Sequence, residues 1–249
     1  MISSIEKTIA FRYLKPKRKE GFLKIISIFS FLGIALGVAI LIIVMSVMNG
    51  FRSELINKIL GFNAHVIVKP YAKKIENGSL KKLQPLSHLI EKKIFAFNGE
   101  GILINKEDTR GILIRGYHKE DIQKIKLLKK GVFEGSLENF NENTISIGKE
   151  LALSLNLSVN DQITLMSSSG IETIVGNLPK QESFVISSIF SSGFAEFDQN
   201  VVFMPIRDAI LFFESSDENL FLEIYLHKPE KIEEAKKSIE NLFPDYFVY

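Results

Sequence analysis

An uninterrupted apolar segment, residues 25–48, constrains this chain more than any other feature of its sequence. It holds twenty-four consecutive residues without a charge, and about 20 apolar residues are enough for a helix to cross the hydrocarbon core of a bilayer. Core helices of soluble proteins are rarely this apolar over such a length. A cleavable signal peptide has a shorter apolar stretch that ends in a small-residue cleavage site, and none follows residue 48. The segment therefore predicts a retained transmembrane helix.

Charge on either side of this segment predicts its orientation. Seven basic and two acidic residues lie within residues 1–24, whereas the rest of the chain carries a small net negative charge. Basic flanks stay in the cytoplasm, and long downstream segments cross the membrane largely regardless of their own charge. We therefore expect residues 1–24 to be a cytoplasmic, basic and amphipathic segment and residues from about 50 onward to lie outside. Beside a span, such a basic stretch contacts lipid headgroups, so we do not expect it to bind nucleic acid.

Two short patterns in and after the predicted span indicate helix contacts. Small residues recur on one face of the span, at Ser30, Gly33 and Gly37, and small residues let a second membrane helix approach closely. The helical spacing then continues to about residue 61. We expect a stalk that projects from the membrane, with four residues at its start: Asn49, Gly50, Phe51 and Glu54.

Beyond residue 61, predicted strands and helices interleave, which is typical of an α+β domain. Residues 71–85 read as a polar loop and residues 86–97 as a helix. Residues 167–183 lie between two predicted strands and read as a long loop, with a β-hairpin of irregular tip as the alternative. Long loops in compact domains are often functional. A solvated loop does not need the apolar residues that this one carries, Ile171, Ile174, Val175 and Leu178.

The sequence contains no pattern that indicates catalysis. The four histidines are scattered, there is no cysteine, and neither a histidine pair nor a His/Cys cluster indicates a metal site. The nucleophile-elbow and phosphate-loop patterns are absent from the sequence as well. We expect no catalytic residues, no bound cofactor and no metal, and therefore no enzyme activity in this chain.

Several motifs resemble those of the lipoprotein-releasing permeases of the LolC/LolE family, which belong to the ABC superfamily. The resemblance is most specific in residues 46–55, Ser-Val-Met-Asn-Gly-Phe-Arg-Ser-Glu-Leu, directly after the span. It extends to residues 11–14 and 26–38 before that segment. It also covers residues 148–152, 161–163 and 176–179 in the outer domain, and so runs over the whole chain.

This resemblance implies a fold, a location and partners. Family members lie in the inner membrane of Gram-negative bacteria and carry a periplasmic α+β domain of the MacB type. Each pairs with a second permease subunit and a cytoplasmic ATPase dimer, which hydrolyses ATP. The complex extracts lipoprotein substrates and hands them to a periplasmic lipoprotein carrier. The periplasmic domain has two lobes, which correspond here to residues 62–117 with 218–249, and to residues 118–217.

In LolC-type members a loop of the second lobe, called the hook, docks the carrier. Residues 167–183 occupy its place, and Gly176 and Pro179 match it, but a proline that is usual in the hook is replaced by Ile174. The resemblance thus assigns carrier docking to Ile171, Ile174, Val175, Gly176, Leu178 and Pro179.

Length is the largest departure from the family, whose members have four transmembrane helices. The chain has 249 residues and ends where the outer domain should return to the membrane. We therefore expect a truncated or split permease. Two alternatives remain open, namely a single-span membrane-anchored sensor or scaffold, and a related ABC permease for efflux or cell division.

Overall fold

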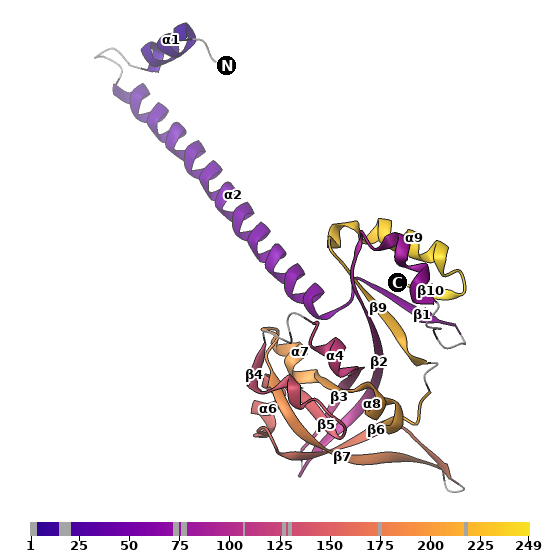
Figure 1. Ribbon diagram of the computed structural model, residues 1–249. Helices are drawn as coiled ribbons and strands as arrows, with labels where there is room; N and C mark the ends of the chain where they lie inside the picture. The colour runs from indigo at the N-terminus through magenta and orange to yellow at the C-terminus, as the bar shows by residue number, and fades with distance from the viewer. Residues whose placement is uncertain are drawn as a thin grey trace. The chain divides into compact units, whose positions relative to one another are not determined.

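The computed structural model describes residues 4–14, 21–71, 75, 79–106, 108–125, 128, 131–173, 176–216 and 219–249 (Figure 1). These residues divide into two compact units, Met1–Ile56 and Asn57–Tyr249. Each unit is described by itself below.

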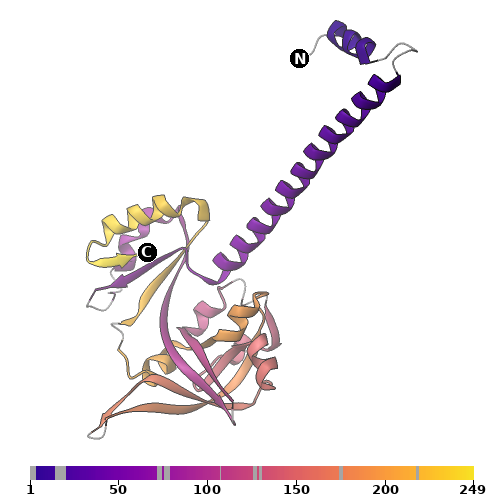
Figure 2. The same ribbon diagram turned by 180° about the vertical axis from the view of Figure 1, so that it is seen from behind.

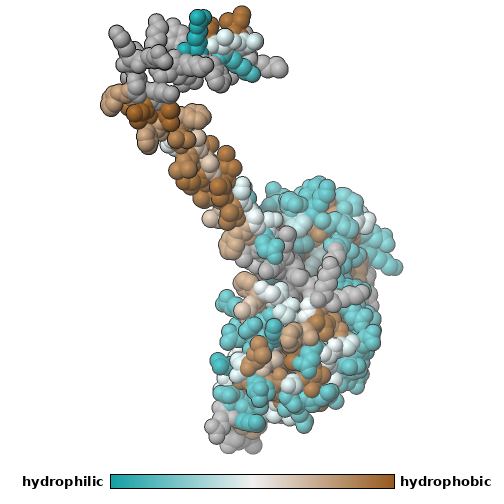
Figure 3. All heavy atoms as spheres, turned by 90° about the vertical axis from the view of Figure 1, so that its left-hand side faces the viewer, coloured by the Kyte–Doolittle hydropathy of each residue, from teal (hydrophilic) through white to brown (hydrophobic). Residues whose placement is uncertain are grey.

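The first unit consists of helices. Helix α1 is Ser4–Leu14, and helix α2 is Gly21–Phe62, whose last residues belong to the second unit. Helix α2 runs without interruption through the predicted span and its continuation. Within it, Ile25–Glu54 is long and apolar enough to cross a membrane, and its side chains are exposed. Figure 3 shows these apolar residues in brown along the helix.

The second unit is built on one ten-stranded mixed sheet. Its strands are β1 Val66–Pro70, β2 Ile90–Asn105, β3 Asp108–Tyr117, β4 Val132–Gly135, β5 Thr144–Gly148, β6 Gln162–Thr173, β7 Gly176–Phe190, β8 Val201–Pro205, β9 Phe221–Leu226 and β10 Tyr246–Val248. Its α-helices are α3 Ser79–Lys82, α4 Lys119–Ile122, α6 Lys149–Leu155, α7 Ala195–Asn200, α8 Ile206–Phe212 and α9 Ile232–Leu242. Among the described residues, short 3-10 helices are Gln84–Leu86, Leu137–Asn139 and Pro229–Lys231.

Part of this sheet closes on itself. The pairings run from β2 through β3, β8, β5, β7 and β6 and then back to β2. Closure pairs the strand edges that an open sheet leaves exposed. Inward-facing apolar side chains from these strands and from α6 and α8 form one core, which includes Leu103, Ile114, Ile147, Leu165 and Phe184.

Strand β2 belongs to this barrel and also extends beyond it. Its first half pairs with β9, which pairs with β1, which in turn pairs with β10. Helix α9 covers this end of the sheet through Ala235 and Ile239, together with Phe243 just after the helix, as Figure 2 shows from behind. The α+β fold class is thus confirmed, with β2 as the strand that connects the two ends of the sheet.

The predicted helix at residues 86–97 is wrong, because most of it is the start of strand β2. Apolar residues at positions 86, 89, 90, 94 and 97 fit helical spacing. In the structure, however, β2 lies between β9 and β3, so that Ile94, Ala96 and Phe97 are all buried. Pairing on both edges therefore overrode the local pattern.

The predicted polar loop at residues 71–85 is also more structured than expected. It contains α3 and the start of a 3-10 helix, and it buries Ile75 and Leu83. Strand β4 and helix α7 were not predicted. The predicted interleaving of strands and helices beyond residue 61 is confirmed.

Candidate functional site

The segment predicted as a long loop, residues 167–183, is instead the outer part of a β-hairpin. Strands β6 and β7 pair from Gln162–Val185 to Thr173–Gly176, with an irregularity between Met166 and Gly170. The Ser-Ser-Ser-Gly sequence at this irregularity reads locally as a loop. The loop prediction is therefore wrong, because backbone pairing of the strands continues past the irregularity.

Beyond Ser167, strand β6 pairs only with β7 and no longer with β2. We call this outer part, residues 168–182, the distal ribbon. The extra residues that a bulge inserts bend a strand pair, so the ribbon leaves the barrel, and Figure 1 shows it extending away from the other strands. The base stays fixed, because Ile163, Leu165 and Phe184 are buried in the barrel core.

The structure describes some of the predicted docking residues. Ile171 pairs with Leu178, and Gly170 pairs with Pro179, so these residues meet across the ribbon. The side chain of Leu178 is 57% exposed. Gly176 begins strand β7. Ile174 and Val175 lie outside the described residues.

Lys180 lies at the neck of the distal ribbon, beside the irregularity. Its Nζ donates to the backbone oxygen of Leu211, 2.9 Å away at the end of helix α8, and lies 3.5 Å from Oε2 of Glu182. A cation is favoured at the carboxyl end of a helix. This contact therefore ties the neck of the ribbon to α8.

A buried ionic cluster, which the sequence did not reveal, connects β3 to β9. Nη2 of Arg115 donates to Oε1 of Glu223 at 2.5 Å, and the hydroxyl groups of Tyr117 and Tyr225 donate to the same carboxylate at 3.0–3.1 Å. Nη1 of Arg115 lies 3.5 Å from Oδ1 of Asn63, the residue that follows helix α2. The cluster therefore fixes the start of the domain chain to its central strands.

Electrostatics keep Arg115 charged and both tyrosines protonated. Burial alone lowers the pKa of Arg115, but the tyrosines and Glu223 outweigh it and raise the pKa above its usual value. Burial raises the pKa of Tyr117 and of Tyr225, so both hydroxyl groups remain protonated donors. In the sequence, only the charged residue Glu223 within the otherwise apolar strand β9 indicated that such a cluster exists.

His65 lies next to this cluster. Its Nδ1 accepts a hydrogen bond of 2.7 Å from the backbone nitrogen of Leu226, and its ring meets that of Tyr225 edge to face at 5.9 Å. Burial lowers the pKa of His65, with Glu91 opposing and Lys92 reinforcing the shift. The ring is therefore held neutral, because a protonated Nδ1 does not accept a hydrogen bond.

The predicted packing residues of the membrane helix lie on α2. Ser30, Gly33 and Gly37 are exposed, and a Cβ atom built on either glycine meets nothing within 4 Å. The four predicted stalk residues, Asn49, Gly50, Phe51 and Glu54, are helical and exposed as well. The face is therefore open to a neighbouring helix. Within the described part of the chain, no group of three or more His, Cys, Asp or Glu residues is arranged to hold a metal.

The chain has an apolar helix long enough to span a membrane, followed by an α+β domain that is built on a single sheet. These two features define its class as a membrane protein with one folded domain outside the bilayer. Residues 27–242 match the family of the MacB-like periplasmic core domain, and the chain belongs to that family. The match begins within the apolar helix and includes nearly all of the second unit.

Curated relatives confirm the resemblance seen in the sequence. The chain is 29% identical to the lipoprotein-releasing system transmembrane protein LolC of Xylella fastidiosa strain Temecula1, over 84% of this chain and 51% of that protein. It is 28% identical to the protein LolE of the same system in Haemophilus influenzae, over 95% and 58%. The chain thus spans about half the length of the curated relatives it matches.

One solved structure is also similar. It is the extracellular domain of the noncanonic ABC-type transporter YknZ from Gram-positive bacteria, with 11% identity and a TM-score of 0.48, covering 74% of this chain and 98% of that one.

Proposed function

We propose that this chain is the N-terminal part of a transmembrane permease subunit of an ABC complex that releases lipoproteins from the inner membrane to a periplasmic carrier. The observation that carries the proposal is the extent of the similarity. It covers 84% of this chain in LolC and 95% in LolE, and the family match includes the apolar helix as well as the domain. The relatives are named as transmembrane proteins of the lipoprotein-releasing system.

In this proposal, residues 1–24 lie in the cytoplasm and residues 62–249 lie in the periplasm. The basic flank before the apolar segment supports this orientation. The complex also contains a second permease subunit and an ATPase dimer, which carries out ATP hydrolysis. This chain acts mechanically, and its helix transmits movement between the membrane and the domain.

We assign carrier docking to the distal ribbon. Two features support this assignment. The ribbon is a two-stranded element outside the barrel, and such an element gains stability when a partner covers it. Its Leu178 side chain is more than half exposed, in a position where a partner can bury it. The pairing of Ile171 with Leu178 places two of the docking residues at one level of the ribbon.

The division of the domain into two lobes, residues 62–117 with 218–249 and residues 118–217, is part of the same proposal. One apolar cluster supports it, because all its buried residues come from the predicted first lobe. They include Val66, Leu83, Leu222 and Phe243. Strands β2 and β3 then connect this lobe to the barrel.

Capture of the purified carrier by the full chain in detergent tests the proposal. Leu178→Asp should lower capture at least about tenfold, because it places a charge where an apolar contact forms. Leu153→Asp is the matched control, since Leu153 is also exposed, at 64%, but lies on α6. Equal capture by Leu178→Asp and the native chain would contradict the docking assignment.

A further inference from the structure

Strand β2 has an interval along one edge where no strand pairs with it. Strand β3 pairs with β2 along its other edge, from Ala96 to Asn105. On the edge in question, β9 pairs with β2 as far as Ala96, and β6 begins to pair at Gly101. Residues 97–100 therefore lie between two neighbouring strands and pair with neither of them.

The backbone groups on this edge lack other partners among the described residues. N–H and C=O groups of successive residues in a strand point to opposite edges, so half of those in residues 97–100 face the interval. Outside the strand pairings, no backbone hydrogen bond involves these four residues. Unpaired strand edges are templates for pairing with another chain.

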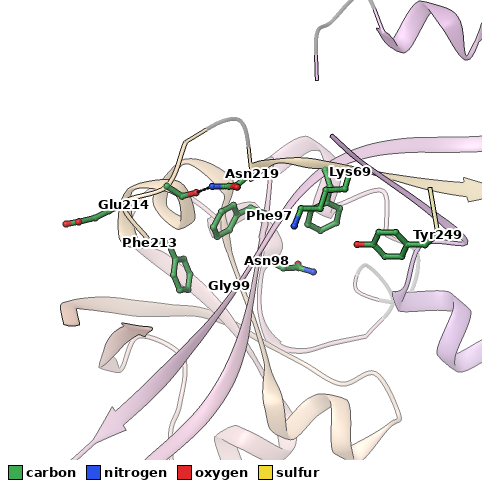
Figure 4. Close-up of a pocket in the computed structure, with 10 residues that line it drawn as sticks. Lys69, Phe97, Asn98, Gly99, Phe213, Glu214, Asn219 and Tyr249 are labelled. Atoms are coloured by element: carbon green, nitrogen blue, oxygen red, sulfur yellow. Dashed lines mark hydrogen bonds between the residues drawn. The ribbon is translucent and has the colours of Figure 1, made fainter. Parts of the chain in front are cut away.

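A pocket opens at this interval. It has a volume of about 450 Å³ and is lined by Phe97, Asn98 and Gly99 of β2, by Phe213 to Ser215, by Asn219 and Phe221, and by Lys69 and Tyr249. Figure 4 shows Asn98 and Gly99 along the strand, with Lys69 and Tyr249 on one side and Phe213 on the other. Among the described residues, the interval therefore borders a pocket that a ligand can enter.

The two flanking strands share one direction, which we take for the added strand as well. Both β6 and β9 run antiparallel to β2. Strand β6 stops pairing with β2 at Ser167, opposite Gly101, and β9 begins to pair with β2 at Phe221, opposite Ala96. A segment that continued this direction would start opposite Glu100 and end opposite Phe97. Four residues of a strand span about 13 Å.

Charge distinguishes the two ends of the interval. Lys69 follows Val68, which pairs with Leu222, so Lys69 lies beside the start of β9. Its side chain is exposed and lines the pocket. An occupant that runs antiparallel to β2 therefore brings its carboxyl end to Lys69.

We propose that this interval, which we call the β2 slot, binds an extended polypeptide segment of a partner by strand addition. The segment pairs antiparallel to residues 97–100 and has an acidic residue at its carboxyl end. Backbone hydrogen bonds supply the affinity in such complexes, and neighbouring side chains supply the specificity. This site is separate from the distal ribbon and does not depend on carrier docking.

The test uses the full chain in detergent and a fluorescein-labelled peptide with the length of the interval, Val-Thr-Val-Asp, in fluorescence anisotropy and hydrogen exchange. We expect saturable binding and slower exchange of those amides in residues 97–100 that face the interval. An analogue that is N-methylated at alternate residues should not bind, because methylation removes backbone donors without changing the side chains.

Charge reversal then tests the direction. Lys69→Glu should weaken binding of this peptide about two- to fivefold, the range of an exposed ion pair, and should strengthen binding of the same peptide with Lys in place of Asp. Lys237→Glu, an exposed residue of α9, is the control and should change neither. Leu178→Asp should bind the peptide like the native chain, which separates this site from the docking assignment.

Three results would overturn the β2 slot. One is equal binding of the N-methylated analogue. Another is exchange protection by the peptide at β10 or β4 rather than at residues 97–100. The third is slow exchange, before any peptide is added, of those amides in residues 97–100 that face the interval rather than β3, which would show that the chain itself fills the interval.

Discussion

The guanidinium group of Arg115 and the carboxylate of Glu223 lie 2.5 Å apart, from Nη2 to Oε1, although strand β2 separates the two strands that carry them. Ala96 of β2 pairs with Tyr117 on one side and with Phe221 on the other. The ion pair therefore spans the width of β2. Both charged side chains are almost completely buried.

Glu223→Leu should therefore destabilise the domain strongly. It leaves the charge of Arg115 and the hydroxyl groups of two tyrosines without their acceptor, and breaking a buried pair costs about 3–5 kcal/mol. Glu223→Gln keeps an acceptor and should lose less. Urea denaturation of the full chain, followed by near-UV circular dichroism, measures both.

The control for this prediction is the exposed pair of Arg207 and Glu142, whose atoms are 3.0 Å apart. Arg207→Ala should cost no more than about 1 kcal/mol, because solvent screens exposed pairs. A similar loss for Arg207→Ala and Glu223→Leu would show that burial does not set the strength of the pair.

Helix α2 and strand β2 show how far the sequence predicted the fold. Composition alone defined α2, because a run of uncharged residues is a local property. Strand β2 was missed at its start, because the spacing of Leu89, Ile90 and Ile94 also fits a helix. Only the pairing of β2 with β9, more than 120 residues later in the chain, decides between the two.

For the candidate sites as well, local features could be predicted from the sequence and long-range pairing could not. The segment that carries the distal ribbon was found from its length and its apolar residues, but its pairing was not, because the Ser-Ser-Ser-Gly sequence gives no register. The cluster around Arg115 and Glu223 unites residues that lie 108 positions apart. The β2 slot depends on where two other strands stop pairing, which no local pattern encodes.

Gly148→Ala should destabilise the domain severely. A Cβ atom at Gly148 would overlap the backbone oxygen of Asp198, which belongs to α7 and is not a flexible side-chain end. Overpacking of this kind costs about 1–3 kcal/mol and occasionally more. Gly111→Ala is the control, because a Cβ atom there meets nothing within 4 Å. Thermal denaturation should show a large loss of Tm for the first variant and little change for the second.

Stability should fall in mild acid because of His65. The pKa of His65 in the folded protein is lowered from the ordinary value of 6.5, so the unfolded chain takes up this proton first. The contribution is fully present above pH 6.5 and is lost as pH falls through the folded pKa, at no more than about 1.4 kcal/mol per pH unit. Urea denaturation of His65→Asn should show a flatter pH dependence, whereas His227→Asn, at an exposed position, should retain the native slope.

The orientation of the chain can be tested with cysteines, because the native sequence has none. In spheroplasts, a membrane-impermeant maleimide should label Lys237→Cys and should not label Ser4→Cys until the membrane is disrupted. Both positions are exposed, so access to the reagent depends on the side of the membrane. Labelling of Ser4→Cys alone in intact spheroplasts would reverse the orientation proposed from the basic flank.

The small face of helix α2 should determine its association with a second permease subunit. Leu in place of Gly33 and Gly37 adds bulk on the face where small residues permit close helix contact, so co-purification of that subunit should fall several-fold. Ala39→Leu is the matched control, because two residues along a helix turn through about 200° and place Ala39 nearly opposite Gly37. All these positions are exposed in α2, so neither change alters packing within the chain. An equal loss with Ala39→Leu would mean that added bulk anywhere on the helix disturbs assembly, and the glycine face would then have no special role.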